Sequence, residues 1–322
     1  MQELAVKVVG MTWHTGRQAE GKTILVTGAN AGIGYFVAEQ LAASGADVVL
    51  GCRDTAKADL AMRAIKVRVP DARLRGVRLD LSDLSSLPAA VDALEADRLD
   101  AVVLNAGILL SGPDRRVNAQ GHELMFATNY LGHFALVAHL APILTATAHS
   151  RVITVGSFAA RSERLDLADL HSEHDYQAKR TYGRSKLAQM LFGFELDRRL
   201  RSHGSDTAGI VAHPGGALDS LTPSRPPLFV RTTAQHLRGL PAGLVLHGKH
   251  TAAETIVRTV LDPEITGGQL WGPRVFGLRG RPHRETPHPH LADPDTAAEL
   301  WAASSALTGL DPLERPVAPA RP

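Results

Sequence analysis

The sequence predicts an α/β fold in which a parallel sheet is covered by helices on both faces, a doubly wound arrangement. Between residues 21 and 155, short apolar runs of strand length alternate with stretches of helical apolar spacing. Strands separated by helices in this way are joined by crossovers and therefore lie parallel. In addition, the first apolar run leads into a glycine-rich turn and then into a helix. A strand, a turn and a helix in that order form a site for phosphate groups.

The predicted strands are short β-branched or apolar runs, and the predicted helices are longer stretches with helical apolar spacing. Two of the helices end at a glycine, Gly45 and Gly204, which is a common stop signal. Strands are expected over residues 23–26, 46–51, 75–80, 101–104, 151–155, 207–213 and 269–272. Helices are expected over residues 35–44, 55–67, 82–97, 122–148, 181–203, 251–261 and 296–307.

The glycine-rich turn covers residues 27–34 and reads Thr-Gly-Ala-Asn-Ala-Gly-Ile-Gly. Its exposed backbone N–H groups and the positive end of the following helix would face a pyrophosphate, and the glycines would let it come close. The spacing Gly-x3-Gly-x-Gly differs from the commoner dinucleotide fingerprint Gly-x-Gly-x-x-Gly. A plain tight turn is the alternative, but the strand before and the helix after favour a nucleotide site.

Composition and charge exclude several classes of function. With 322 residues the chain can bury a large core, and its length alone allows one or two domains. The net charge of +2 gives no general case for nucleic acid as a partner. A single cysteine, Cys52, excludes an internal disulfide and fits a reducing compartment. No apolar run approaches the roughly 20 residues of a membrane helix, so we expect a soluble, cytoplasmic protein with no membrane partner.

Four segments fall outside the regular alternation. Residues 1–20 precede the first strand and are predicted to form an N-terminal arm. Residues 216–248 contain four prolines and no sheet period, which is typical of a lid or substrate-binding segment. Residues 273–292 are rich in Pro, Gly, Arg and His. Within them, the His-rich residues 283–290 are expected to be a solvated loop rather than a metal site, because they contain prolines and no second ligand cluster matches them. Residues 311–322 form a Pro-rich tail that we expect to be disordered.

Tyr182 and Lys186 lie four residues apart in a predicted helix and therefore on one of its faces. A free tyrosine has a pKa of about 10 and exchanges protons poorly at neutral pH. A fixed cation nearby favours the phenolate and lowers that pKa, so the pair could carry out acid–base chemistry. Taken alone, the same spacing also fits an ordinary pair on a helix surface.

Two further polar residues stand at informative positions. Ser157 closes the predicted strand 151–155, at the carboxyl end where doubly wound sheets bind ligands, although a loop hydroxyl satisfying the backbone is the alternative. Asn129 falls inside a predicted helix, where asparagine is a mediocre helix former. A buried Asn129 must be hydrogen-bonded, so it indicates either a structural kink or part of a polar network.

Together these motifs resemble the short-chain dehydrogenase/reductase family. They occur in the family's order: the Thr-Gly-x3-Gly-x-Gly turn, Asn105-Ala106-Gly107, Asn129, Ser157, Tyr182-x3-Lys186 and Pro214-Gly215. The resemblance covers about residues 21–310 and implies a single Rossmann-like domain with about seven parallel strands. The chain looks most like the retinol-dehydrogenase-like branch. The resemblance to this branch rests on four features: Gly51-Cys-Arg-Asp54, Thr128-Asn-Tyr-Leu-Gly-His-Phe134, the 25-residue step from Ser157 to Tyr182, and residues 300–309.

The resemblance implies a role for each matching residue. Tyr182 would donate or take the proton of the substrate oxygen, Lys186 would lower the tyrosine pKa and hold the nicotinamide ribose, and Ser157 would orient the carbonyl. Asn129 would hold a water that links Lys186 to solvent. The hydride chemistry would belong to the nicotinamide. The cofactor-binding residues that it implies are Gly28, Asn30, Gly32, Ile33, Gly34, Asp80, Leu81, Asn105, Ala106, Gly107, Tyr182, Lys186, Pro214 and Gly215.

The choice of cofactor depends on the end of the second predicted strand. An acidic residue there accepts the ribose hydroxyls of NAD, whereas an arginine accommodates the extra phosphate of NADP. Arg53 therefore favours NADP(H), because a guanidinium can grip a phosphate with paired hydrogen bonds. Asp54 follows immediately and could either cap the next helix or repel the phosphate. One departure from the family concerns the position after Pro214-Gly215, where a Thr or Ser is usual and this chain has Asp219, with Ser220 next to it. Either the loop shifts by one residue or this contact is lost.

The sequence thus predicts an NADP(H)-preferring oxidoreductase that interconverts an alcohol and a ketone or aldehyde. Its pocket would lie between Ser157, Tyr182 and the segment 216–248, and family members often pair as homo-oligomers. The alternatives are a nucleotide-sensing protein without turnover, an NAD-dependent enzyme, and an epimerase-type relative. A hydrophobic substrate is expected because of a predicted apolar wall formed by Leu218, Leu221, Leu228, Phe229 and Val230.

Overall fold

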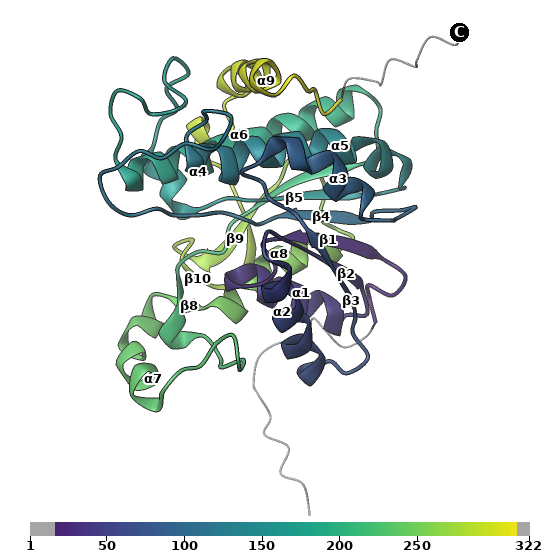
Figure 1. Ribbon diagram of the computed structural model, residues 1–322. Coiled ribbons are helices and arrows are strands. Elements are labelled where there is room, and N and C mark those ends of the chain that lie inside the picture. Colours follow the sequence, from purple (N-terminus) through teal and green to yellow (C-terminus); the bar gives the residue numbers. More distant parts are fainter. Residues whose placement is uncertain (1–16, 314–322) are drawn as a thin grey trace, which may run out of the picture.

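The structure is a computed structural model that describes residues 17–313. Most of the predicted N-terminal arm, residues 1–20, and of the predicted tail, residues 311–322, lies outside the described residues. Between these ends the strands and helices alternate as predicted and build one central sheet with helices on both faces (Figure 1).

The central sheet has eight strands in the order β10-β9-β6-β5-β4-β1-β2-β3. Every neighbouring pair is parallel except β10 and β9, which are antiparallel. The prediction of about seven parallel strands is therefore confirmed, with one antiparallel strand added at the edge. The strands are β1 Thr23–Thr27, β2 Asp47–Cys52, β3 Arg73–Arg78, β4 Ala101–Leu104, β5 Arg151–Val155, β6 Ala208–Ala212, β9 Leu270–Val275 and β10 Arg279–Glu285.

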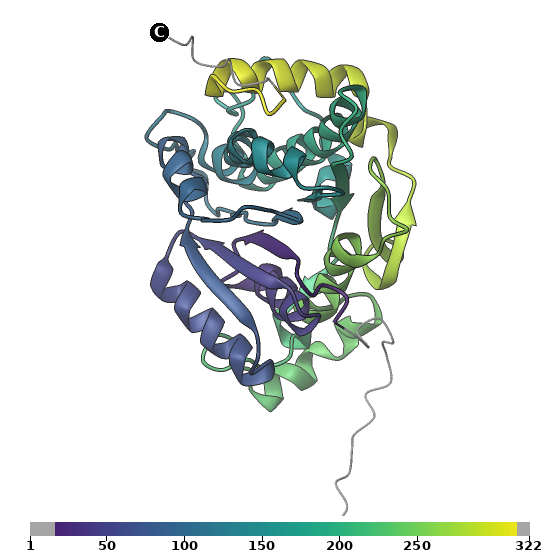
Figure 2. The same cartoon turned by 90° about the vertical axis from the view of Figure 1, so that its right-hand side faces the viewer.

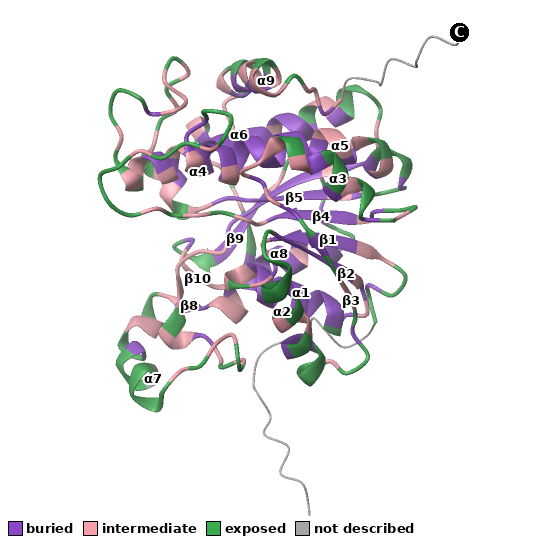
Figure 3. Cartoon of the chain, viewed as in Figure 1, coloured by how far each residue is buried: buried purple, intermediate pink, exposed green. Residues whose placement is uncertain are grey.

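Helices cover both faces of the sheet because the buried strands present apolar side chains to both sides. Helices α1, α2 and α8 lie on one face, and α3, α4, α5 and α6 lie on the other, with α9 packed outside α6 (Figures 1 and 2). Figure 3 shows the strands and the inward helix faces as the buried part of the molecule. The helices are α1 Gly32–Ala43, α2 Thr55–Arg68, α3 Leu87–Asp92, α4 Leu124–Phe126, α5 Gly132–Ala146, α6 Ala178–Ser202, α8 Lys249–Leu261 and α9 Pro294–Thr308.

The strand order reverses at β1, which lies between β2 and β4. In the strand register, Thr27 at the carboxyl end of β1 pairs with Gly51 of β2, and Val26 pairs with Val103 of β4. Ligands of doubly wound sheets bind in the crevice outside the strand ends at such a switch point. The fold therefore places the glycine-rich turn, which follows Thr27, where a dinucleotide is expected to bind.

Strand β10 corrects the prediction that residues 283–290 form a loop, because it extends to Glu285. Pro282 of β10 stands opposite Pro273 of β9, and the register shifts between Arg279 and Pro282. Proline cannot donate to a strand ladder, so it is tolerated on an edge strand or next to an irregularity. The high proline and glycine content of residues 273–292 conceals an edge strand that pairs on one side only.

The segment 216–248 is attached to α1. It contains β7 Ala217–Leu218, η4 Asp219–Leu221, α7 Thr233–Gly239, η5 Pro241–Leu244 and β8 His247–Gly248. Phe229 packs against the rings of Tyr35 and Phe36, and Leu228 joins the same apolar cluster. Leu228, Phe229 and Val230 also line a cavity of about 460 Å³, which neither Ser157 nor Tyr182 lines. The predicted apolar wall of the substrate pocket therefore stays a prediction. Val230 is exposed, and α7 forms a largely exposed lobe (Figure 3).

One helical stretch, Leu124–Ala146, is long and apolar enough to cross a membrane by length and composition. This stretch joins α4, the π-helical turn η2 (Ala127–Leu131) and α5. The expectation that no apolar run approaches membrane length is therefore too strict. Within the protein, however, 72% of its most apolar window is buried, as in the core helix of a soluble protein.

Candidate active site

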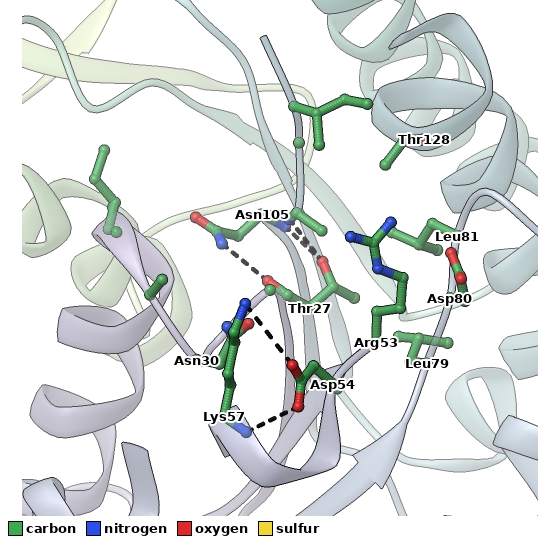
Figure 4. Close-up of a pocket in the computed structure, with 18 residues that line it drawn as sticks. Thr27, Asn30, Arg53, Asp54, Lys57, Leu79, Asp80, Leu81, Asn105 and Thr128 are labelled. Atoms are coloured by element: carbon green, nitrogen blue, oxygen red, sulfur yellow. Dashed lines mark hydrogen bonds and ion pairs between the residues drawn. The ribbon is translucent and has the colours of Figure 1, made fainter. Parts of the chain in front are cut away.

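A cavity of about 410 Å³ opens at the carboxyl ends of β1, β2 and β4 (Figure 4). Most of the predicted cofactor-binding residues line this cavity, which confirms that the fold brings them together. Those residues are Gly28, Asn30, Gly32, Ile33, Arg53, Asp80, Leu81, Asn105, Ala106 and Gly107. The cavity is also lined by Lys57, Leu79, Ile108 and Thr128, which the sequence analysis did not single out.

The glycines of the turn are required by close packing. Gly28 has a φ of +67°, and a Cβ at this position would lie 2.9 Å from the Cα of Ala106. A Cβ on Gly34 would collide with the amide nitrogen of Asn105. Helix α1 starts immediately after the turn, without a side-chain cap and without an acidic residue in its first turn. Free N–H groups at a helix N-terminus suit an anion, so the residues fit a dinucleotide pyrophosphate.

Thr27 joins the glycine-rich turn to the loop that follows β4. Its hydroxyl oxygen accepts hydrogen bonds from the backbone N–H groups of Asn105 and Ala106, each at 2.9 Å. The Asn105 amide donates to the Thr27 carbonyl at 2.8 Å (Figure 4). Three bonds between two neighbouring strand ends hold both walls of the cavity in a fixed relation.

Arg53 and Lys57 bring two cations to the far end of the cavity. Asp54 caps α2 by accepting from the Lys57 N–H at 3.1 Å, and its carboxylate lies 3.7 Å from the Lys57 ammonium (Figure 4). Of the two roles considered for Asp54, the structure shows the helix cap. No carboxylate of residues 17–313 lies within ion-pair distance of Arg53. Its guanidinium therefore remains free to bind a phosphate.

The remaining predicted cofactor residues differ in their positions. Asp80 accepts from the Ser82 N–H and hydroxyl, and its other oxygen stays available at the cavity. Pro214 and Gly215 do not line this cavity in the described structure. Gly215 has a φ of +72°, and the Leu278 carbonyl oxygen occupies the space of a Cβ. The residue in the place of the family's Thr or Ser, Asp219, forms an ion pair with Lys249 of α8.

Ser157 and Tyr182 meet beyond the carboxyl end of β5. Ser157 is the N-cap of the short helix η3 (Phe158–Ser162), where its side chain accepts from the Ala159 N–H at 3.2 Å. The phenol of Tyr182, from the first turns of α6, lies close to the Ser157 hydroxyl. Burial raises the pKa of Tyr182, and the nearby Ser157 hydroxyl offsets part of this rise. The phenol is therefore protonated at neutral pH.

Lys186 is buried one turn further along α6. Its ammonium donates to the Val155 carbonyl at 3.1 Å and to the Gln189 side-chain oxygen at 2.7 Å. Burial lowers the pKa of Lys186 to about 7. In the described structure the ammonium donates to Val155 and Gln189, and the effect of Lys186 on the tyrosine pKa stays a prediction.

Asn129 lies in the π-helical turn η2 and is fully buried. Its side chain accepts from the Ile108 N–H at 2.7 Å and donates to the Ile108 carbonyl at 3.0 Å and to the Ser185 hydroxyl at 2.9 Å. The helix irregularity and the polar network considered for this residue are thus both present. A Cβ on Gly107 would lie 3.3 Å from the Asn129 amide oxygen and 3.3 Å from the Lys186 ammonium. Asn129 and Lys186 therefore lie against Gly107, which itself lines the cofactor cavity.

Comparison with known proteins agrees with this geometry. The family profile described as "short chain dehydrogenase" matches residues 22–169. Retinol dehydrogenase 13 of Mus musculus is 34% identical over 300 residues, covering 90% of this chain and 84% of the relative. The chain belongs to the short-chain dehydrogenase/reductase family. It is a retinol-dehydrogenase-like member, as its motifs predicted, and the family makes it an oxidoreductase acting on CH–OH groups.

Other relatives of this short-chain dehydrogenase/reductase extend the similarity. Dehydrogenase/reductase SDR family member 13 of Bos taurus is 36% identical over 301 residues, covering 91% of this chain and 75% of the relative. Among solved structures, an uncharacterized protein from Mycobacterium Paratuberculosis is 32% identical and superposes with a TM-score of 0.73. That likeness covers 91% of this chain and 95% of the other chain.

Sequence reasoning missed three polar residues around this dehydrogenase site. Lys57 follows Asp54 by three positions, His133 follows Asn129 by four, and Gln189 follows Lys186 by three. Such spacings place two side chains on one face of a helix. The three residues could therefore have been found by their helical spacing from Asp54, Asn129 and Lys186. Within residues 17–313, no three His, Cys, Asp or Glu side chains gather in a way that could hold a metal ion.

Proposed function

We propose that the chain is an NADP(H)-preferring oxidoreductase that interconverts an alcohol and a ketone or aldehyde, with Tyr182 as the acid and base. The observation that carries the proposal is the approach of the Ser157 hydroxyl to the Tyr182 phenol beyond the end of β5. Lys186 follows Tyr182 on the same helix and lies against Gly107, which lines the dinucleotide cavity. A proton donor and a cofactor site thus lie at the same edge of the sheet, where the parallel strands have their carboxyl ends.

Each of these side chains has a chemical task in carbonyl reduction. When bound, the nicotinamide would supply or accept the hydride. Ser157 would donate a hydrogen bond to the carbonyl oxygen and hold it against the phenol. Tyr182, protonated at neutral pH, would give its proton to the developing alkoxide, and would take it back in alcohol oxidation. Asn129 would hold the Ile108 loop, and so this wall of the cavity, in place through its two bonds to Ile108.

An apolar substrate is supported by side chains next to these groups. Leu109 follows Gly107 in the loop after β4 and is 60% exposed, and Phe158 follows Ser157 and is 40% exposed. Exposed apolar side chains on neighbouring loops beside a catalytic group suit an apolar ligand. The relatives named retinol dehydrogenases also support an apolar alcohol or aldehyde. We further propose that residues 216–248 act as a substrate lid, fixed to α1 at one side.

The cofactor preference predicts a clear result for Arg53→Ala. Its guanidinium is free of carboxylates and lies with Lys57 at one end of the cavity. Losing a charge-assisted bond of about 1.5–3 kcal/mol should weaken NADPH binding roughly 10- to 100-fold. NADH lacks the phosphate, so its affinity should change little. Calorimetric titration of wild type and variant with both nucleotides measures the difference.

The matched control is Arg63→Ala, which removes an exposed arginine of α2 that does not line the cavity. It should leave both affinities unchanged. Tighter binding of NADH than NADPH by the wild type would reject the proposed preference. Failure of both nucleotides to bind would reject the oxidoreductase site as a whole.

A further inference from the structure

The Lys186 ammonium is held by a buried network of uncharged groups. Gln189, one turn further along α6, accepts from the ammonium through its Oε1 at 2.7 Å. Its Nε2 donates to the Leu104 carbonyl, at the carboxyl end of β4, at 2.9 Å. An ammonium can only donate and a carbonyl can only accept, so the orientation of this amide is fixed. Gln189 thereby ties Lys186 to the strand whose end lines the cofactor cavity.

A second arm of the network runs through His133 of α5. The tautomer of the His133 ring follows from counting hydrogen-bond donors and acceptors around it. The Thr27 oxygen uses both lone pairs to accept from the N–H groups of Asn105 and Ala106. Its single proton must therefore be donated, and the His133 Nε2, at 2.9 Å, is closer than the Val103 carbonyl at 3.3 Å.

The Nε2 of His133 is thus an acceptor, and its Nδ1 carries the proton. That Nδ1–H donates to the Asn129 carbonyl at 2.9 Å. The 3.2 Å approach of the Gln189 Nε2 to the same Nδ1 joins two donors and is a packing contact. Burial lowers the pKa of His133 to about 3, which agrees with a neutral imidazole.

The two arms leave few groups free to bind other molecules. The Asn129 side chain already makes three hydrogen bonds within the protein. Its backbone carbonyl accepts from the Nδ1–H of His133, so both amide protons and this carbonyl of Asn129 are engaged within the protein.

We propose that Gln189 and His133 are positioning residues: Gln189 holds Lys186 and sets its affinity for a proton, and His133 connects the Asn129 carbonyl to Thr27 of the glycine-rich turn. The inference rests on the proposed function for the task of Lys186. The inference names the two buried side chains that hold Lys186 and the Asn129 carbonyl in position, which the family motifs alone do not specify.

Few charged or titratable groups surround the Lys186 ammonium, so few of them can influence its pKa. On α6, the titratable neighbour is Tyr182, one turn earlier, and on α5 it is the neutral His133. Strand β5 contributes only the Val155 carbonyl, the loop after β4 contributes Gly107, and η2 contributes the amide of Asn129. No carboxylate in the described chain forms an ion pair with Lys186, and burial lowers its pKa to about 7. A change at position 189 should therefore act directly on Lys186.

The test measures the protonation of Lys186 in two Gln189 variants. The chain has seven lysines, so the full-length protein can be labelled with 13Cε-lysine and titrated by NMR, with Lys186→Arg identifying the signal. Gln189→Glu places a carboxylate beside the ammonium and should raise the pKa of Lys186 by at least about one unit. Gln189→Met keeps the shape but removes the acceptor, so it should lower that pKa.

Shifts in opposite directions support the positioning role, because general damage to the fold would not reverse sign between two variants. Equal shifts, or none in either variant, would overturn it. This readout needs no turnover: a wild type that binds NADPH but reduces no carbonyl would reject the proposed function and leave the NMR result standing.

His133→Phe tests the second arm. Removing the acceptor of the Thr27 hydroxyl should weaken NADPH binding roughly tenfold. Removing the donor to Asn129 should also lower kcat at saturating NADPH. His139→Phe, on the same helix and partly exposed, should change neither quantity. Unchanged NADPH affinity and kcat in a folded His133→Phe protein would remove His133 from the inference.

Discussion

Replacing Tyr182 with phenylalanine is expected to reduce kcat about 10³-fold while NADPH binding changes less than about threefold. The substitution removes only the phenol oxygen, which is the proton donor beside Ser157. The dinucleotide cavity is lined by other residues, so it should remain intact. Steady-state rates at saturating NADPH, together with nucleotide titration, separate the two quantities.

Tyr176→Phe is the matched control for this prediction. Tyr176 lies six residues earlier, and its hydroxyl has no hydrogen-bond partner among the described residues. Its loss should leave kcat within about twofold. Full turnover by Tyr182→Phe would show that another group moves the proton.

Arg225→Met is expected to lower the free energy of unfolding by about 3 kcal/mol. Arg225 forms a bidentate ion pair with Glu39 of α1, with N–O distances of 2.7 and 2.8 Å, and both side chains are largely buried. The variant leaves Glu39 buried without its counter-ion. This pair fastens the segment 216–248 to α1, so urea unfolding should report both the lost stability and any separate unfolding of the segment.

The double variant Glu39→Met/Arg225→Met provides the control, because removing both charges leaves neither of them uncompensated. It should recover at least half of the lost stability. A single variant that unfolds like the wild type would show that the pair contributes little. A double variant less stable than either single variant would show that the attraction outweighs the cost of burying both charges.

The sheet and the cofactor cavity were predictable because their signals are local. Apolar runs gave all seven parallel strands, and the turn after Thr27 gave the position of the cavity. Parallel strands end at one edge of a sheet, so motifs that follow different strands were expected to converge there. Ser157 and Tyr182 both follow β5 and come together beyond its carboxyl end, although 25 residues separate them.

The parts that sequence analysis missed depend on contacts between distant segments. Strand β10 exists only because β9 offers it an edge, and its prolines suggested a loop. The packing of Leu228 and Phe229 against α1 is likewise a contact between distant segments, which their apolar character alone does not reveal. Likewise, Gln189 and the lowered pKa of Lys186 depend on burial between α5, α6 and the sheet, which spacing along the chain does not reveal.

The most direct test of the proposed function follows a hydride from the nicotinamide into a product. The protein would be incubated with NADPH deuterated at both C4 positions and with a panel of apolar aldehydes and ketones, and the alcohols analysed by mass spectrometry. We predict one deuterium at the former carbonyl carbon for at least one compound, and a loss of that product in Tyr182→Phe. Tight NADPH binding with no deuterium in any product would contradict the account and indicate a nucleotide-binding protein without turnover.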